Sequence, residues 1–330
     1  MKKLMNLTTN YYDLLRYSSN EDLKNNYRKF GLDGIEVMVA GIDRKEIIKN
    51  DDVIGVHLKY FYYLVCLWNE DAAKTLAEYD SWDTCRDIFG GTGRDAIIKV
   101  YKQNLNFALK YKPEYTVFHI SDVSMQNSIT RDFSYTDIDV VNAVIDLVNT
   151  VFPEYDLGVT LLFENLWWPG LTLEKPELVE YLINGIKYPN CGVMLDIVHL
   201  FNTNTSIRTV DDGIDHVYRV LSKYGNLDFI KGIHLHQTLS GEYADSVLNE
   251  PFPISGSYFE RFGLVFPHIM KLDAHRPIIS NRVSAPVKHI NLEYLVLEFI
   301  TSSREEHERF LREQINCLPQ FFRQSKLSSV

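Results

Sequence analysis

The sequence predicts a single-domain α/β protein, a (β/α)8 TIM barrel, and three observations lead to this prediction. Short apolar runs alternate with longer amphipathic stretches, which is the pattern of parallel strands joined by helices. Eight such apolar runs occur along the chain. The length of 330 residues suits one barrel with insertions, because barrels of this kind commonly have about 250 residues or more. We therefore expect one domain over residues 1–330.

Each expected strand is a short apolar run, and a helical pattern follows it. The expected strands are Leu4–Thr8, Gly34–Val39, Val53–Lys59, Tyr115–Ser121, Val159–Asn165, Cys191–Leu195, Phe229–Leu235 and Tyr294–Phe299. The expected helices are Glu21–Phe30, Arg44–Asn50, Gly93–Tyr111, Asp137–Val151, Pro176–Lys187, Asp211–Lys223, Tyr258–Leu272 and Glu305–Phe321. The connections Tyr60–Thr92 and Gln237–Asn291, after strands three and seven, are longer than a connection needs. They predict a lid over the C-terminal face or the contacts of a homo-oligomer.

Charge and composition exclude several classes of protein. The chain has 34 basic and 44 acidic side chains, a formal charge of −10, so it repels a phosphate backbone and no nucleic acid partner is expected. The N-terminus has no apolar run, which predicts a cytoplasmic protein without a membrane span. The four cysteines are scattered, as in reduced proteins. Without a G-x-G-x-x-G fingerprint, no nucleotide cofactor is expected.

Polar side chains occupy the last inward position of four expected strands. Because side chains alternate along a strand, Glu164, Asp196, His234 and Glu298 should project together into the mouth of the barrel. Three carboxylates so close together would repel one another without a cation. The sequence therefore predicts a divalent metal site. Its donors suit Mn²⁺ best, with Mg²⁺, Co²⁺ or Zn²⁺ as alternatives.

Further histidines and two tryptophans lie near the same strand ends. His57 and His119 end strands three and four, His199 follows strand six, and His236 is a second inward histidine on strand seven. They could be additional metal or substrate ligands, or simply histidines packed at the rim. Trp167 and Trp168 follow Glu164 closely, and they could stack on a sugar or pack beneath the next loop.

Several of these segments resemble the strand-end motifs of the xylose-isomerase-like TIM-barrel superfamily, which contains sugar isomerases and epimerases together with apurinic endonucleases. The segments are Phe163-Glu164-Asn165, Leu195-Asp196-Ile197-Val198-His199, Lys231-Gly232-Ile233-His234-Leu235, Tyr294-Leu295-Val296-Leu297-Glu298 and, at the start of strand two, Gly31-Leu32-Asp33-Gly34-Ile35-Glu36. The resemblance extends from strand two to strand eight.

The resemblance to the epimerases implies a metal-dependent sugar isomerase or epimerase of carbohydrate metabolism. Glu164, Asp196, His234 and Glu298 would bind the metal, and Glu164 and Glu298 would also transfer the proton. A metal that chelates the carbonyl and hydroxyl oxygens of a sugar stabilises the ene-diolate formed in such a reaction. His199 would then bind a substrate hydroxyl or orient a residue that binds the metal. The sequence favours this function, with a small carbohydrate as substrate.

Two alternatives stay open. The trinuclear zinc site of the apurinic endonucleases is similar to the set His57, His119, Glu164, Asp196, His199, His234 and Glu298. That branch also has an Asp-x-His pair soon after the histidine of strand seven, where this chain has no histidine in residues 241–247. Asp273-Ala274-His275 has the right residues, but it follows an expected helix and we expect it far from the mouth. The second alternative is a barrel that keeps the metal site without catalysis.

Overall fold

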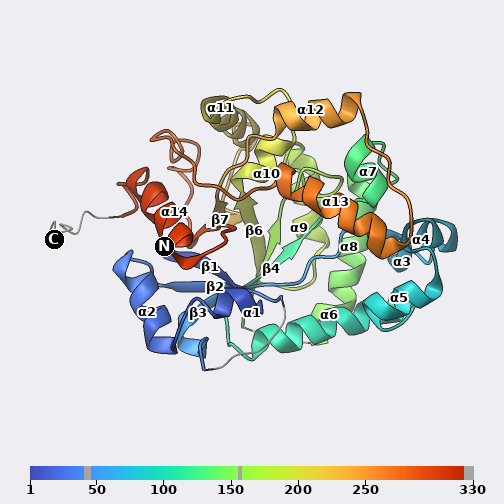
Figure 1. The fold of residues 1–330 in the computed structure, drawn as a ribbon, viewed down its shortest axis with the longest axis horizontal. Coiled ribbons are helices and arrows are strands. Elements are labelled where there is room, and N and C mark those ends of the chain that lie inside the picture. The colour runs from blue at the N-terminus through green and yellow to red at the C-terminus, as the bar shows by residue number, and fades with distance from the viewer. Residues whose placement is uncertain (41–45, 155–157, 323–330) are drawn as a thin grey trace.

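The computed structural model describes residues 1–40, 46–154 and 158–322, and it contains a closed barrel of eight parallel strands in chain order (Figure 1). The strands are β1 (Lys2–Thr8), β2 (Gly34–Met38), β3 (Val53–His57), β4 (Tyr115–His119), β5 (Thr160–Glu164), β6 (Cys191–Asp196), β7 (Ile230–Leu235) and β8 (Tyr294–Leu297). β1 pairs with both β2 and β8, which closes the barrel. The TIM-barrel prediction is confirmed, and each expected strand lies within two residues of an observed one.

The longer helices also lie where the amphipathic patterns place them. They are α2 (Asn20–Lys29), α6 (Arg94–Leu109), α8 (Asp137–Val151), α9 (Pro176–Gly185), α11 (Val210–Leu221), α13 (Tyr258–Leu272) and α14 (Arg304–Asn316). Among the described residues there are also short helices that the periodicity did not indicate: α1 (Tyr11–Leu14), α3 (Val65–Trp68), α4 (Ala72–Tyr79), α5 (Trp82–Phe89), α7 (Met125–Thr130), α10 (Ile197–Asn202) and α12 (Gly241–Asn249). The expected helix Arg44–Asn50 lies partly outside the described residues. Residues 46–49 within it form turns and coil, and the short 3-10 helix η1 (Asn50–Asp52) follows.

The interior of the barrel is filled by alternate strand residues, as the period of two requires. The buried cluster inside it consists of Leu4, Tyr115, Val117, Leu162, Met194, Tyr294 and Val296. Glycine at position 55 makes room for Tyr115, because a Cβ at Gly55 would lie 2.1 Å from the Tyr115 ring. Tyr115 can therefore cross the barrel, where its hydroxyl donates a hydrogen bond of 2.6 Å to Glu36.

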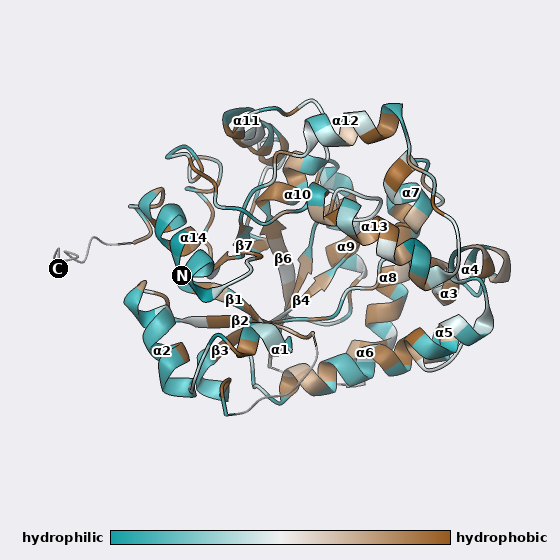
Figure 2. Ribbon diagram, viewed as in Figure 1, coloured by the Kyte–Doolittle hydropathy of each residue, from teal (hydrophilic) through white to brown (hydrophobic). Residues whose placement is uncertain are grey.

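The outer layer follows the usual division of an α/β barrel. The strands are apolar, whereas the surrounding helices have mixed faces with their polar residues outward (Figure 2). A single large cluster of buried side chains joins the strands to these helices. Among the described residues, no helix is both long enough and apolar enough to cross a membrane.

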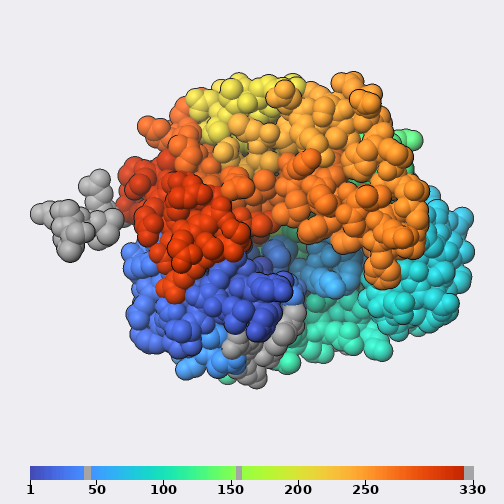
Figure 3. Space-filling view, viewed as in Figure 1, coloured from blue at the N-terminus to red at the C-terminus, as the bar shows by residue number. Residues whose placement is uncertain are grey.

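A second apolar cluster forms a lid that is separate from this core. The lid, as we use the term, consists of α7, α12 and α13 together with Trp167 and Trp168. α12 and α13 come from the long connection after β7, and both helices contact α7 (Figure 1). Figure 3 shows the surface hollowed between the orange residues of α13 and the blue residues of the N-terminal part of the chain.

Glu78 of α4 ties the connection after β3 to the lid, and it makes stability depend on pH. Its side chain is 6% exposed and accepts a hydrogen bond from the backbone N–H of Met125. Burial raises the pKa of Glu78 from 4.5 to about 7, although the bond from Met125 opposes this. Since the folded state favours the protonated acid, its contribution is fully present below about pH 4.5 and is lost as the pH rises through 7.

We therefore expect Glu78→Gln to be more stable than the wild type at pH 8, by about 2–3 kcal/mol, and to match it within about 0.5 kcal/mol at pH 4.5. Glutamine keeps the acceptor for Met125 but has no charge to bury. Urea denaturation at the two pH values measures the difference. A stability difference that does not change with pH would show that the pKa of Glu78 is the same in the folded and unfolded states.

Candidate metal centre

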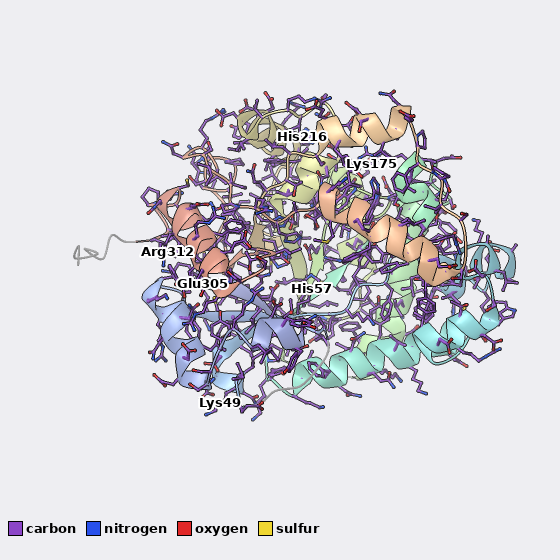
Figure 4. All side chains as sticks on the ribbon, in the orientation of Figure 1. Lys49, His57, Lys175, His216, Glu305 and Arg312 are labelled. Carbon is purple, nitrogen blue, oxygen red and sulfur yellow. The ribbon has the colours of Figure 1, made fainter. Side chains whose placement is uncertain are left out.

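Six histidines and four carboxylates meet at the mouth of the barrel. His57, His119, Glu164 and Asp196 end their strands, His234 is the last residue but one of β7, and Glu298 directly follows β8. The other members are His199, His236, Asp273 and His275. Most of these side chains are buried; only His119 and Asp273 keep partial exposure. Figure 4 shows His57 near the middle of the molecule. The four carboxyl-end residues that the sequence predicts to converge do so.

The first group of potential ligands is His57, His119 and Glu164. One oxygen of Glu164, Oε2, lies 2.9 Å from His57 Nε2 and 2.7 Å from His119 Nε2. His57 Nδ1 lies 2.9 Å from the carbonyl oxygen of Leu58, to which it can donate its proton. That bond leaves His57 Nε2 as the lone-pair donor facing the site.

The second group contains the four residues that the sequence analysis selects, Glu164, Asp196, His234 and Glu298, whose ligand atoms lie within 4.8 Å of one another. Its carboxylate Glu164 is shared with the first group, because its other oxygen, Oε1, lies 3.0 Å from His234 Nδ1. His234 Nδ1 also lies 3.2 Å from Glu298 Oε2. Glu164 is thus placed to bridge two metal positions.

Glu36 of β2 is a residue of the site that the sequence analysis missed. Its carboxylate is buried and lies 3.0 Å from His234 Nε2. Burial would raise the pKa of Glu36, but His234, His57 and the Tyr115 hydroxyl hold it below the usual range. Glu36 therefore accepts the Nε2 proton of His234 and directs Nδ1 toward the metal group. Glu36 ends the segment Gly31-Leu32-Asp33-Gly34-Ile35-Glu36, which resembles the family motif, and it lies on the inward face of β2. This position is the signal that could have identified it.

We expect Glu36→Gln to lower the affinity for a metal at the second group by about 10- to 100-fold, with little change in fold. The neutral amide accepts the His234 proton less strongly than a carboxylate does, so the imidazole becomes a weaker ligand. Competition with a chromogenic chelator measures the affinity, and Glu177→Gln on the exposed face of α9 is a matched control. An affinity equal to that of the wild type would mean that Glu36 does not orient His234.

The third group is His199, Asp273 and His275, and it corrects an expectation from the sequence. We expected the Asp273–His275 segment far from the mouth, and this was wrong. Asp273 Oδ2 lies 3.3 Å from His199 Nε2 and 3.0 Å from His275 Nε2. His199 in turn approaches Asp196, since Asp196 caps α10 and accepts a 2.8 Å hydrogen bond from the His199 backbone N–H. His199 Nδ1 lies 2.7 Å from the carbonyl oxygen of Asn165, which leaves Nε2 for the site.

The path of the chain after α13 explains the correction. α13 belongs to the lid, so its C-terminal end returns to the barrel. There Gln237, just beyond β7, forms an antiparallel bridge with Arg276, with N–H···O distances of 2.6 and 2.8 Å. Thr238 Oγ1 also accepts a 2.6 Å bond from the Ala274 N–H. His275 adopts φ +48°, a strained conformation for a residue with a side chain. A hydrophobic pattern does not reveal a bridge of this kind.

His236 lies between the second and third groups. Its Nε2 is 2.7 Å from Asp196 Oδ2, and its ring stacks on His275 at a centroid distance of 3.8 Å. His234 points at Glu164 and Glu298 instead, so both inward histidines of β7 lie at the site.

The charges of the site fit metal cations. Burial disfavours the charged form of these side chains, and it lowers the pKa of His119. For His199, His275, Glu164 and Asp273 the attraction between imidazoles and carboxylates outweighs burial. The carboxylates of Asp196 and Asp273 raise the pKa of His199 to about 10. The carboxylates of Asp273 and Glu298 raise that of His275 to about 9. Adjacent histidines hold the pKa of Glu164 and of Asp273 well below the usual range.

Several buried polar atoms of the centre also have no hydrogen-bond partner among the described residues. They are His119 Nδ1, His236 Nδ1, Asp273 Oδ1, His275 Nδ1 and Glu298 Oε2. Buried carboxylates that face several histidines, together with unsatisfied polar atoms, are the arrangement expected of a ligand set whose protons metals displace. The residues therefore fit divalent metals.

Trp167 and Trp168 belong to the lid. They are 6% and 1% exposed, and their ring centroids are 4.4 Å apart. The Trp167 ring also lies 5.1 Å from the His199 ring. Trp167 thus packs between the lid and the metal centre, while Trp168 is enclosed in the lid.

Comparisons with known proteins agree with this architecture. The family model described as xylose isomerase-like TIM barrel matches residues 92–278. A curated relative, the probable endonuclease 4 of Halothermothrix orenii, is 31% identical over 103 residues, which are 31% of this chain and 37% of the relative. The match thus spans little more than a third of that relative.

Two solved structures are similar to this chain at low sequence identity, and the one with a TM-score above 0.5 shows the same fold. The IolI protein with a zinc atom has a TM-score of 0.51 and 14% identity, over 98% of this chain and 100% of that one. D-psicose 3-epimerase, solved in the presence of D-fructose, has a TM-score of 0.48 and 16% identity, over 97% and 99% of the two chains. The family model covers more than half of the sequence, and the barrel closes as that model requires. The chain therefore belongs to the xylose isomerase-like TIM-barrel family.

Proposed function

We propose that the protein is a metal-dependent phosphodiesterase with three metal positions. The observation that carries this proposal is the third group, His199, Asp273 and His275, at the mouth of the barrel. From the sequence, the supposed distance of this Asp-x-His pair was the main argument against the apurinic endonuclease branch. Because the Asp273–His275 pair lies at the site, that argument no longer applies.

Each metal position would be held by one of the three groups. His57, His119 and Glu164 hold the first, Glu164, Asp196, His234 and Glu298 the second, and His199, Asp273 and His275 the third. Metals bound there would polarise a phosphoryl oxygen and lower the pKa of a bound water. Six histidines with four carboxylates suit Zn²⁺ better than the Mn²⁺ that the sequence analysis placed first, since imidazole favours zinc over harder cations.

The residues of the chain would hold the three metal positions in place and surround them with an environment that contains little water. Glu164 fixes the first two groups relative to each other, because its two oxygens face different histidines. Asp196 both faces the second group and caps α10, which sets the position of His199. Trp167 and Tyr60 border the centre with aromatic rings, 5.1 Å from His199 and 4.7 Å from His119. Such a dry site strengthens the attraction between cations and a phosphate.

The second candidate function is the sugar isomerase or epimerase that the sequence favours. Glu164, Asp196, His234 and Glu298 form a complete group by themselves, within 4.8 Å. One metal and the two glutamates would suffice for proton transfer next to a carbonyl. This candidate ranks second because it gives no role to Asp273 and His275, which the chain after α13 brings to the site.

The two functions are separated by giving one preparation both kinds of substrate. We expect protein loaded with Zn²⁺ to hydrolyse bis(4-nitrophenyl) phosphate, to lose that activity after treatment with a chelator, and to regain it with Zn²⁺. We expect no exchange of the C3 proton of D-fructose or D-psicose in D2O. Proton exchange without hydrolysis, in protein with its metals bound, would replace the first candidate by the second.

A further inference from the structure

A cavity of about 280 Å3 lies between the loop after β3, α4, α5, α7 and α13. Its wall is mainly apolar, and several aromatic side chains contribute to it, among them Tyr60, Tyr62, Phe89 and Phe262. None of the ten side chains of the metal centre belongs to this wall. The cavity is therefore a separate compartment under the lid.

The ring of Tyr60 lies between the cavity and the metal centre. Tyr60 lines the cavity on one side, and its ring centroid lies 4.7 Å from that of His119 on the other. His119 belongs to the first group of metal ligands, with its Nε2 2.7 Å from Glu164. A substrate that places its reacting group at the metals could thus extend past Tyr60 into the cavity.

One buried acid gives the cavity polarity. Glu78 is part of the wall and is 6% exposed. Its Oε1 accepts the Met125 N–H at 3.0 Å, and no described residue donates a hydrogen bond to its Oε2. A carboxyl oxygen in the wall of an apolar cavity, without a donor from the protein, favours a ligand that brings one.

The volume and the lining limit the shape of that ligand. A cavity of about 150 Å3 with apolar walls can hold one benzene ring. A space of 280 Å3 therefore suits two fused rings. Tyrosine and phenylalanine side chains favour a flat aromatic ligand, because ring faces and edges pack well against one another.

We propose that the cavity binds a planar two-ring heteroaromatic group of the substrate, with a ring N–H donating to Glu78. This inference rests on the proposed phosphodiesterase function, since it assigns the group that the substrate carries beside its reacting phosphate. The acidic charge of the chain disfavours long nucleic acids, whereas a small ester with one such group needs no extended basic surface.

Indole and 1-methylindole test the inference, because they share two fused rings and differ in the N–H donor. Calorimetric titration of the zinc-loaded full chain at pH 8 should show indole binding at least about 10-fold more tightly than 1-methylindole. Glu78→Gln presents an amide donor to the cavity, so it should bind indole no more tightly than 1-methylindole. Equal affinities of wild-type protein for the two compounds, or no binding of either, would overturn the inference.

A filled cavity gives a second test with a matched control. Val265 lines the cavity, whereas Leu264 is 51% exposed on the same helix. Val265→Phe should weaken indole binding by at least about 10-fold, and Leu264→Phe should leave it unchanged. Thermal melting checks that both variants fold, and unchanged indole binding by folded Val265→Phe would contradict the assignment of the cavity.

The binding assay tests the inference about the cavity, and the hydrolysis assay tests the proposed function, so a negative result in one can be told from a negative result in the other. Indole binding with no hydrolysis of bis(4-nitrophenyl) phosphate would overturn the proposed function, and with it the role of the cavity in a phosphodiester substrate. Hydrolysis with no indole binding would overturn only the inference. Where both hold, indole should inhibit hydrolysis with an inhibition constant equal to its dissociation constant; binding without inhibition would show that the cavity is no part of the substrate site.

Discussion

Replacing Glu164 by glutamine is expected to lower kcat/KM for phosphodiester hydrolysis by at least about 10³-fold, which corresponds to about 4 kcal/mol of transition-state stabilisation. Both oxygens of Glu164 face histidines, at 2.7 and 2.9 Å on one side and 3.0 Å on the other. An amide has one oxygen and no charge, so it cannot bridge two metal positions. We expect the bound zinc to fall from three ions to one.

Glu177→Gln is the control for this prediction, because Glu177 is exposed in the first turn of α9. It should keep the activity and metal content of the wild type. Steady-state hydrolysis of bis(4-nitrophenyl) phosphate and elemental analysis of both variants measure the two effects. Glu164→Gln protein that is folded and retains all its metal would refute the bridging role.

Replacing Asp273 by asparagine is expected to remove one metal ion and to lower kcat/KM by about 10²-fold or more, about 2.7 kcal/mol. Asp273 Oδ2 lies between His199 and His275, so the third group loses its charged member. The first two groups do not contain Asp273 and should keep their metals.

The same variant distinguishes the two candidate functions. A sugar isomerase with one metal in the second group should keep its proton exchange in Asp273→Asn, whereas a three-metal hydrolase should not keep its rate. Asp228→Asn, an exposed carboxylate in the turn before β7, serves as the control. Full hydrolytic activity in Asp273→Asn would remove the third group from the mechanism.

The sequence contains enough information for the barrel and for the four polar residues that meet at the strand ends. Side chains alternate along a strand, so the last inward residue could be identified once the strand was found, and Glu164, Asp196, His234 and Glu298 do meet. An error of one or two residues in the predicted end of a strand does not change this result. Side chains alternate between the two faces, so an inward residue is still identified as inward.

The missed residues depend on features that no local pattern encodes. Glu36 is an inward residue of β2, and its importance follows from the direction of the His234 ring across the barrel. Asp273 and His275 reach the mouth because α13 packs into the lid and the Gln237–Arg276 bridge fixes the returning chain. These are contacts between segments far apart in the sequence.

The amount of metal bound per chain tests the central claim most directly. Protein that is purified, saturated with Zn²⁺ and freed of excess metal should contain about three zinc ions per chain by elemental analysis, and Asp273→Asn about two. One ion per chain in the wild type, with no loss in Asp273→Asn, would contradict the three-metal centre and favour the single-metal isomerase.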